Sequence, residues 1–449
     1  MKIKTFKIGG IYPNDNKITS EVPIVRLPDP KQAEVMLLQH IGSPSQCIVK
    51  VGEHVEFEQL LAEDSSFVSA CVHAPISGVI KSIERKRNSQ GYYVESITIV
   101  SESEDDAINY SNVNPRTRTQ AEVDSLTAKE IIDIVDNSGI VGMGGATFPT
   151  RVKLLPPEGM QPSLVIINGA ECEPYLTCDD ALMRAYPAEI VKGIELIMRA
   201  TGVKQAKIGI EKNKPVAIKI INEILQGRKD IEVIPLKKKY PQGGEKQIIE
   251  AILSKEVPTG ALPIATGAIV QNVATAFAVY DAIYNYHPIT KRVVTVTGPN
   301  VKNPGNFIAT IGTPIRDLIE AVGGLPEDTG KVIAGGPMMG KAVVNLDAPV
   351  TKGLSGVLIF PKEESLRKEE GPCIRCSKCV NVCPMGLEPY LIMTYSKYEN
   401  WEECEKNKAA NCIECGSCSY ICPSNRPLLD FIRFGKQKVN NIIKQRNKR

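Results

Sequence analysis

Eight of the thirteen cysteines in the sequence fall into two runs with the same spacing. In each run, two residues separate the first three cysteines, three residues precede the fourth, and a proline follows it directly. Thiolates at this spacing lie on a tightly turned backbone whose amides point inward, so three sulfurs can bind one iron–sulfur cube. The runs are Cys373, Cys376, Cys379 and Cys383, followed by Cys412, Cys415, Cys418 and Cys422.

The fourth cysteine of each run is expected to face away from its own run, because the proline after it stops the helix. In two-cluster ferredoxins such a cysteine ligates the other cluster. The spacing therefore predicts two [4Fe–4S] clusters with crossed ligands, one on Cys373, Cys376, Cys379 and Cys422 and the other on Cys412, Cys415, Cys418 and Cys383. Structural zinc is the alternative, but zinc sites usually take cysteine pairs separated by a longer gap. Cys404 lies between the runs and fits neither spacing, so we expect it to be a packing residue.

The composition limits the remaining function classes. The 449 residues suggest about three domains, and 43% hydrophobic with 23% charged residues is a globular composition. A net charge of +3 is too small to indicate nucleic-acid binding. No apolar run reaches the roughly 18 residues of a membrane span, and the first residues lack the apolar core of an export signal. The four histidines are expected to be structural, and no Ser/His/Asp arrangement is apparent.

Short alternating strands with glycine turns are predicted for residues 43–100. This pattern resembles the barrel-sandwich hybrid of biotinyl and lipoyl carriers. Those carriers need a modifiable lysine at the turn between their two halves, and here the turn is Asp64–Phe67, which has none. A swinging-arm role is therefore not favoured. Acidic and polar residues at 101–106 and 109–120 predict a linker after this unit.

Alternating strand and helix patterns follow, with strands at 164–167, 206–210 and 231–236 and helices at 187–201 and 216–225. They predict a Rossmann-like parallel α/β unit, and residues 292–334 predict a small β-grasp unit. The region between the cysteine runs has helical patterns at 389–397 and 400–408. We therefore expect a multidomain α/β plus β protein with four units: a barrel-sandwich hybrid at 1–105, an α/β domain at 106–288, a β-grasp unit at 289–350, and a mostly helical two-cluster ferredoxin-like domain at 351–449.

Three segments of the α/β unit carry chemical groups. Residues 141–150 form a glycine loop with Lys153 shortly after it, and such loops let backbone amides approach a phosphate. Residues 168–174 place polar and acidic groups after a buried strand, where α/β folds bind ligands. The third segment is 240–245, with 271–275 further on. Taken alone, the glycine loop is weak evidence for phosphate binding. It lacks the full G-x-G-x-x-G spacing of dinucleotide-binding loops, and a tight turn would explain its glycines equally well.

Together these segments resemble the flavin and NADH site in the flavoprotein subunit of respiratory complex I. The resemblance implies that the glycine loop and Lys153 hold FMN and its phosphate. It implies that Asn168, Asn272 and Thr275 contact the flavin, and that Phe148, Glu173 and Glu245 line the nicotinamide side, with the two glutamates as catalytic residues. The full set of implied cofactor-binding residues is Gly142, Gly144, Gly145, Phe148, Lys153, Asn168, Glu171, Glu173, Gly243, Gly244, Glu245, Asn272 and Thr275. The sequence departs from that family at Met143, where the family has Arg, and at Thr147, where it has Gly.

The order of the modules, with Gly9–Pro13, Gln39–Gly42 and Asn168–Tyr175, resembles the C subunit of the Rnf electron-transport complex. The resemblance implies a peripheral subunit on the cytoplasmic side of the cell membrane, which exchanges hydride between NAD(H) and FMN and single electrons through the clusters. Its partners would be membrane-integral subunits and an iron–sulfur subunit, with ferredoxin as an indirect partner and Na⁺ or H⁺ as the coupling ion. A soluble cobalamin reductase and a non-catalytic electron relay are the alternatives. The cobalamin enzymes have their barrel unit after the other modules, whereas here it comes first.

The end of the chain, Leu428 to Arg449, predicts a basic amphipathic helix. Leu428, Ile432, Val439 and Ile443 fall on one helical face, and the same segment has seven basic residues against one acid, Asp430. Such a helix can lie on anionic lipid or pack on a membrane-integral partner. A solvated basic tail is the simpler alternative.

Overall fold

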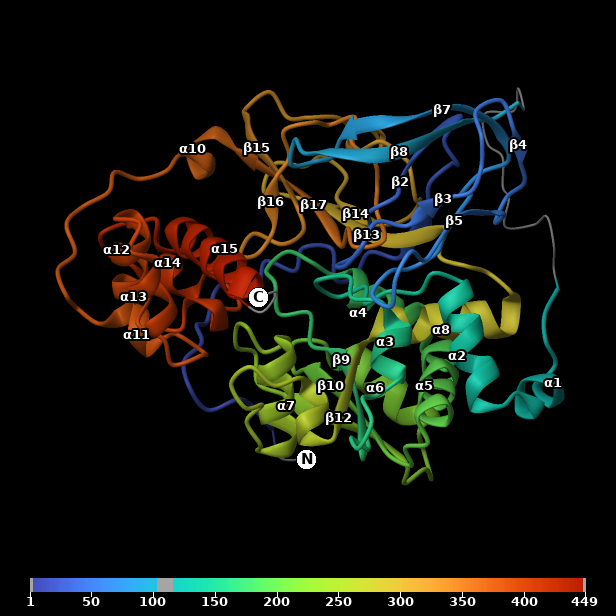
Figure 1. Ribbon diagram of the computed structural model, residues 1–449, viewed down its shortest axis with the longest axis horizontal. Helices are drawn as coiled ribbons and strands as arrows, with labels where there is room; N and C mark the ends of the chain where they lie inside the picture. Colours follow the sequence, from blue (N-terminus) through green and yellow to red (C-terminus); the bar gives the residue numbers. More distant parts are fainter. Residues whose placement is uncertain (1–2, 103–115, 447–449) are drawn as a thin grey trace.

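The computed structural model describes residues 3–102 and 116–446 of the chain. The predicted linker and the expected boundary at residues 105–106 lie largely outside the described residues. Figure 1 shows the elements as one assembly, with the barrel and the β-grasp unit above the α/β unit and the helical C-terminal module at one side. These positions bring the carboxyl edge of the α/β sheet next to the cysteines.

The N-terminal unit is built from two small antiparallel sheets, as the barrel-sandwich prediction requires. One sheet has the order β2-β8-β7-β4 and the other β3-β5-β6. Their inner faces close over an aliphatic core that includes Val35, Leu61, Ile80 and Ile97. The strands are β2 (Gln32–Met36), β3 (Gln46–Cys47), β4 (His54–Val55), β5 (Leu60–Glu63), β6 (Val72–His73), β7 (Gly78–Arg87) and β8 (Tyr93–Val100).

The α/β unit contains a four-stranded parallel sheet of order β11-β10-β9-β12. Its strands are β9 (Leu164–Gly169), β10 (Ala206–Glu211), β11 (Ile231–Leu236) and β12 (Ala268–Asn272). One large core packs on one face of the sheet with α5 and α8, and a smaller one packs on the other face with α7. The helices are α1 (Gln120–Ser125), α2 (Ala128–Asn137), α3 (Thr150–Leu154), α4 (Cys178–Ala185), α5 (Pro187–Thr201), α6 (Pro215–Ile224), α7 (Glu245–Leu253), the short 3-10 helix η2 (Pro263–Thr266) and α8 (Val273–Asn285).

The β-grasp unit is a six-stranded mixed sheet of order β1-β14-β13-β17-β15-β16 with α9 (Ile315–Ala321) packed on it. Two of its strands lie outside residues 289–350: β1 comes from the start of the chain and β17 follows residue 350. The sheet therefore includes segments that the sequence pattern assigned to the neighbouring units. The strands are β1 (Ile24–Arg26), β13 (Lys291–Thr297), β14 (Gly305–Thr310), β15 (Thr329–Ala334), β16 (Lys341–Ala342) and β17 (Gly356–Pro361).

The C-terminal module is helical, and each cysteine run spans a loop and the short helix that follows it, α11 in the first run and α14 in the second. Its buried core joins Ile392, Met393 and Ile432 to Cys383 and Cys418 of the two runs, and it also contains Cys404. The elements are α10 (Lys362–Ser365), α11 (Lys378–Asn381), α12 (Pro389–Lys397), α13 (Trp401–Lys406), the 3-10 helix η3 (Ala409–Asn411), α14 (Ser417–Ile421) and α15 (Leu428–Arg446). The helices predicted at 389–397 and 400–408 are thus confirmed, the second as a shorter helix.

Candidate functional site

The predicted flavin residues gather where β9 and β12 end. Asn168 and Asn272 are register partners on these neighbouring parallel strands. The Asn272 amide donates to the Asn168 carbonyl at 3.3 Å, and the Asn168 amide donates to the Gly243 carbonyl at 2.8 Å. The ends of the two strands and the loop before α7 are therefore linked at the carboxyl edge of the sheet, which is the ligand-binding edge of such folds.

The glycine loop lies against the same edge. An ideal Cβ on Gly144 would meet the Asn272 amide at 2.3 Å, so only glycine fits there. A Cβ on Gly145 would meet no atom within 4 Å, and both glycines are exposed. Thr275 holds the start of the loop, because its hydroxyl accepts from the Met143 N–H at 3.0 Å and donates to the Val141 carbonyl at 3.2 Å. The loop can thus present its backbone to a ligand at Gly145.

Lys153 and Glu245 face each other across this edge. The Lys153 ammonium on α3 lies 2.6 Å from the Glu245 carboxylate at the first position of α7, and it also donates to the Val270 carbonyl at 3.1 Å. The residue implied to bind the FMN phosphate therefore pairs with a residue implied to line the nicotinamide side. Close by, Gln271 is buried, and neither polar atom of its amide has a hydrogen-bond partner among the described residues. An ammonium, an unpartnered amide and an open glycine backbone fit a phosphorylated polar ligand such as FMN.

The two departures from the complex I pattern attach the glycine loop to the β-grasp unit. The Met143 side chain is buried, and its carbonyl accepts from the buried guanidinium of Arg292 at 2.6 Å. Thr147 has a φ of +54°, a left-handed conformation that favours glycine. A Cβ on Gly353 would lie 2.5 Å from the Thr147 methyl group, so the threonine packs directly on that glycine. The backbone at position 143 and the Thr147 side chain therefore hold the loop to its neighbour, whereas the Met143 side chain packs in the core of the α/β unit.

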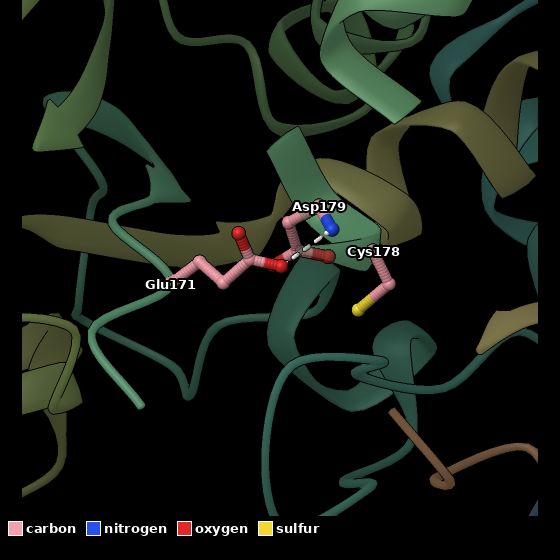
Figure 2. Close-up of side chains that lie close together, drawn as sticks. All are labelled: Glu171, Cys178 and Asp179. Atoms are coloured by element: carbon pink, nitrogen blue, oxygen red, sulfur yellow. Dashed lines mark hydrogen bonds between the residues drawn. The ribbon is translucent and has the colours of Figure 1, made fainter. Parts of the chain in front are cut away.

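Glu171 does not point toward this group of residues. Its carboxylate accepts from the Asp179 N–H at 2.7 Å at the start of α4, as Figure 2 shows. Lys17 and Lys214 lie 3.9 Å and 4.0 Å from it. Burial raises the pKa of Glu171 to about 7, and the two lysines oppose that rise.

Cys178 and Asp179 complete the group drawn in Figure 2. One potential metal-ligating atom from each of the three side chains lies within 4.8 Å of the other two. The Asp179 carboxylate accepts from the Asn272 amide at 2.8 Å, and burial raises the pKa of the Cys178 thiol well above its usual value. Because the two carboxylates are held by protein donors and the thiol stays protonated, we interpret this group as structural, with Glu171 capping the start of α4.

Glu173 is bound to the β-grasp unit. Its two carboxylate oxygens accept from the N–H groups of Met338 and Met339, each at 2.9 Å. The Tyr240 hydroxyl lies 3.4 Å from the same carboxylate. Burial raises the pKa of Glu173 to about 7, against the effect of these hydrogen bonds. In this arrangement the carboxylate lies between the α/β unit and the loop before β16.

Phe148 and the remaining glycines are near the site without joining its polar network. Phe148 is half-buried, and its carbonyl accepts from the Gly142 N–H at 2.8 Å. A Cβ on Gly244 would lie only 2.4 Å from the Gln247 side chain. The absence of a side chain at Gly244 therefore allows the tight start of α7.

Four cysteines line one cavity in the C-terminal module, and they come from both runs. Cys383 of the first run lies with Cys412, Cys415 and Cys418 around one pocket, which Ile392 and Ile432 also line. Burial raises the pKa of the Cys412 thiol to about 11, and the nearby Cys383 and Cys415 add to that rise. Thiols in such surroundings need a cationic partner to ionise, and the iron of a [4Fe–4S] cluster supplies it.

The other four cysteines lie at the surface. Cys373 and Cys376 are exposed, and Cys379 and Cys422 are partly buried. Cys379 on α11 and Cys422, directly after α14, pack on the same core, and these two helices contact each other. Burial raises the pKa of the Cys379 thiol, and the nearby Cys422 adds to that rise. Cys404 is fully buried against the Ser396 hydroxyl, 3.4 Å away, and lies outside both groups.

The amphipathic helix predicted at the C-terminus is confirmed as α15, but its apolar face is already covered. Leu428, Ile432 and Val439 are buried in the core of the module, and Ile443 packs on it. Several basic side chains also have acidic partners: Arg433 and Lys436 pair with Glu414, and Arg446 with Glu405. The face expected to meet lipid is therefore packed on α12 and α13. None of the described helices is both long and apolar enough to cross a membrane.

Several residues that organise the site were not expected from the sequence. The partly buried Lys17 donates to the Glu171 and Glu173 carbonyls at 2.8 and 2.9 Å. The buried Lys352 donates to the carbonyls of Cys71 and Gly139, and so joins the barrel to the segment before the glycine loop. Burial lowers its pKa to about 8. Isolated lysines in polar segments carry no periodic signal, so only the tertiary structure identifies them.

Comparison with protein families gives the same four units. Residues 4–104 match the RnfC barrel sandwich hybrid domain, and residues 135–281 match the Nuo51 FMN-binding domain. Residues 293–342 match the SLBB domain, and residues 365–423 match a 4Fe-4S dicluster domain. The fold and site thus define a flavin and iron–sulfur electron-transfer protein with one FMN-binding domain and two [4Fe–4S] clusters, and zinc in the cysteine module is not supported.

Relatives over the full length identify the family. The chain is 42% identical over its whole length to the C subunit of the Na⁺-translocating ferredoxin:NAD⁺ oxidoreductase complex of Acetobacterium woodii, covering 99% of that protein. The chain is 39% identical, over 90% of its length, to the C subunit of the proton-translocating ferredoxin:NAD⁺ oxidoreductase complex of Clostridium ljungdahlii, and the match covers 87% of that protein. It is 40% identical, over 97% of its length, to the C subunit of the ion-translocating oxidoreductase complex of Rhodobacter capsulatus, and the match covers 84% of that protein. The chain belongs to the family of Rnf complex C subunits. It is therefore a subunit of a membrane-associated complex and has other subunits of that complex as partners.

A solved structure shares part of the fold. An NAD⁺-reducing [NiFe]-hydrogenase in the H₂-reduced state superposes with a TM-score of 0.50 at 19% identity, over 74% of this chain and 70% of that one. At this identity the likeness concerns the fold alone.

Proposed function

We propose that this chain exchanges hydride between NAD(H) and FMN and passes single electrons through its two clusters. In the proposed reaction, a ferredoxin:NAD⁺ oxidoreductase complex couples this electron flow to ion translocation by partner subunits. The observation that carries the proposal is the meeting of Lys153, Gly145, Asn168 and Asn272 at one sheet edge, next to a module with two sets of four cysteines. FMN can accept the two electrons of a hydride and release them singly, which the clusters require.

The residues of the sheet edge are proposed to divide the binding of FMN and NAD(H). Lys153 would hold the FMN phosphate, after exchanging its contact with Glu245 for the ligand. Asn168, Asn272 and Thr275 would contact the flavin beside the glycine loop. Glu245 and Phe148 would line the nicotinamide side. Glu173 would reach the nicotinamide side only if its carboxylate left the Met338 and Met339 amides. When NAD(H) binds, Glu173 therefore either moves or acts through the loop that contains these two methionines.

For the cysteines we propose the crossed scheme, with one cluster on Cys373, Cys376, Cys379 and Cys422 and the other on Cys412, Cys415, Cys418 and Cys383. It is supported by the common cavity of the second set and by the proximity of Cys379 to Cys422.

We place the protein at the cytoplasmic side of the cell membrane, held by membrane-integral subunits and an iron–sulfur subunit, with ferredoxin as an indirect electron partner. The apolar face of α15 is used inside the module, so attachment through other subunits is favoured over insertion of this helix into lipid. The basic residues of the tail can still contact anionic headgroups. Relatives are named for Na⁺ and for protons, and the coupling ion of this chain is not assigned.

One anaerobic experiment tests the proposal. Purified protein, loaded with FMN and iron–sulfide, is mixed with NADH while its flavin and cluster absorbance are followed. We expect both to bleach, and a flavin that NADH leaves oxidised would refute the site. Gly145→Val should abolish FMN binding, because a Cβ at this position meets no protein atom within 4 Å and the branched side chain would occupy the space proposed for the ligand. Glu245→Gln should slow NADH oxidation while FMN content stays near that of the wild type.

A further inference from the structure

The two cysteine sets have different neighbours. The buried set, Cys383, Cys412, Cys415 and Cys418, lies where the C-terminal module meets the α/β unit. Val382 and Cys415 both touch residues of the α/β unit or of the N-terminal segment packed on it. The exposed Cys373 and Cys376 make no hydrogen bond to the α/β unit or to the N-terminal segment within the part of the chain that the structure describes.

Tyr240 connects the flavin side to the buried set. Its hydroxyl donates to the Cys415 carbonyl at 2.8 Å, and its side chain is 1% exposed. It stands three residues before Gly243, whose carbonyl accepts from Asn168 at the proposed flavin site. A single short loop therefore contacts both the flavin edge of the sheet and the loop that carries a cluster ligand.

The N-terminal segment fixes both Tyr240 and the other ligand loop. The backbones of Ile11 and Tyr240 exchange two hydrogen bonds, at 2.8 and 2.9 Å. The Gly10 N–H donates to the Val382 carbonyl at 2.8 Å, and a Cβ on Gly9 would lie 2.5 Å from the Cys383 carbonyl oxygen. In Figure 1 this segment, coloured blue, runs between the α/β unit and the C-terminal module. The Gln247 amide of α7 adds a contact to the Pro384 carbonyl at 3.4 Å.

We propose that the buried set holds the cluster next to the flavin, and that Tyr240 is a positioning residue that fixes this cluster against the flavin-binding loops. The set containing Cys373 then passes electrons to a partner at the surface. This inference rests on the proposed function. NADH supplies two electrons and leaves as NAD⁺ with release of one proton, and each cluster takes one of the electrons, the surface cluster receiving its electron through the buried one.

The order of the clusters is tested with two ligand variants of the full chain, Cys412→Ser in the buried set and Cys373→Ser in the exposed set, each loaded with FMN and iron–sulfide. EPR spectra are taken after NADH and after dithionite. In Cys373→Ser, NADH should reduce the remaining cluster as fast as in the wild type. In Cys412→Ser, dithionite should reduce the remaining cluster, while NADH reduces the flavin and leaves that cluster oxidised for much longer. The opposite pattern, or equal rates in the two variants, would overturn the order.

The role of Tyr240 is tested with Tyr240→Phe, which keeps every cluster ligand. This variant therefore tests the positioning of the buried cluster even if Cys412→Ser or Cys373→Ser loses both clusters. The matched control is Tyr284→Phe, which loses a hydroxyl contact to Gln120 elsewhere in the α/β unit. Tyr240→Phe should keep full iron content and slow cluster reduction several-fold more than flavin reduction, because the Cys415 loop loses its hydrogen bond to the loop on the flavin side. The EPR spectrum of the buried cluster after dithionite should also change. Unchanged rates and spectra, or equal slowing of flavin reduction, would refute a positioning role.

A wild-type protein whose flavin is not reduced by NADH would refute the proposed function itself. That result is distinct from a reduced flavin with the wrong cluster order, which would refute only this inference.

Discussion

The two sets of cysteines share one sequence pattern but have opposite surroundings. Cys415, Cys418 and Cys383 are buried where the module meets the rest of the molecule, whereas Cys373 and Cys376 are exposed. The spacing determines how three sulfurs can be presented to a cluster, and it is the same in both runs. The other units determine what surrounds the cluster, because Tyr240, the Gly9–Gly10 turn and the loop at Met338 cover only one of the two sets.

This difference has a consequence for the chemistry of the clusters. Reduction adds a negative charge, and a buried apolar site solvates that charge less well than a site open to water. The buried set is therefore expected to have the lower reduction potential. Electrons that start from NADH would then move toward the exposed set, and from there to a partner.

The largest effect is expected from breaking the crossed ligation. Cys383→Ser should remove the cluster built on the second run, and Cys422→Ser the cluster built on the first run, each with loss of about half of the iron. Iron analysis and EPR spectra of the two variants measure this. Cys404→Ser is the control and should keep both clusters, since Cys404 contacts Ser396 and lies outside both sets. Damage to the cluster of the same run in both variants would contradict the scheme.

The next effect concerns access of solvent. Exposure of Cys373 and Cys376 should let oxygen and chelators reach the first cluster, so its absorbance should bleach several-fold faster in air than that of the buried cluster. Variants that retain a single cluster, Cys412→Ser and Cys373→Ser, allow the two rates to be measured separately. Equal bleaching rates would show that the partner-free protein exposes both sites alike.

Much of this comparison was accessible from the sequence. The cysteine spacing indicated the two clusters, and the alternation of strands and helices predicted the parallel sheet with β9, β10 and β11 at the expected residues. The resemblance to the complex I flavoprotein implied that Asn168, Asn272 and Lys153 share a site, and the three do lie together at the carboxyl edge of the sheet.

The remainder depends on contacts between distant segments. Gly9 and Gly10 were noted only as part of a family pattern, and their packing on Cys383 and Val382 requires the complete fold. Glu173 was expected at the nicotinamide side, yet its carboxylate binds amides more than 160 residues away in the chain. The periodicity of α15 predicted an amphipathic helix correctly, but an apolar stripe does not reveal whether lipid or protein covers it.

A smaller effect tests how the buried set is held. Gly9 has a φ of +68°, and its absent Cβ would collide with the Cys383 carbonyl. Gly386 has a similar φ of +62°, lies three residues after Cys383, and would place a Cβ in open space. Both alanine variants carry the same backbone strain of about 1 kcal/mol, but only Gly9→Ala adds the collision. Gly9→Ala should therefore alter the EPR spectrum and lower the occupancy of the buried cluster alone, whereas Gly386→Ala should resemble the wild type. Similar losses in both variants would mean that strain, rather than the contact with Cys383, explains the effect.

The smallest effect concerns pH and the loop that covers the buried set. Glu173 binds the Met338 and Met339 amides, and a Cβ on Gly416, next to Cys415, would lie 2.9 Å from the Met338 carbonyl.

Burial raises the pKa of Glu173 to about 7 from its ordinary 4.5. The folded protein therefore binds the proton more tightly than the unfolded chain, so this contribution to stability is complete below pH 4.5 and is lost as the pH rises through 7. The loss amounts to at most about 3 kcal/mol, and Glu171 adds a change of the same sign. Glu173→Gln, which resembles the protonated carboxyl, should have a stability near that of the wild type at about pH 5 and should lose less stability between about pH 5 and about pH 8. Thermal unfolding of the cluster-free chain, followed by the fluorescence of Trp401, the one tryptophan in the sequence, measures this within the C-terminal module. Parallel pH profiles for the two proteins would show that Glu173 does not hold the cover of the buried set.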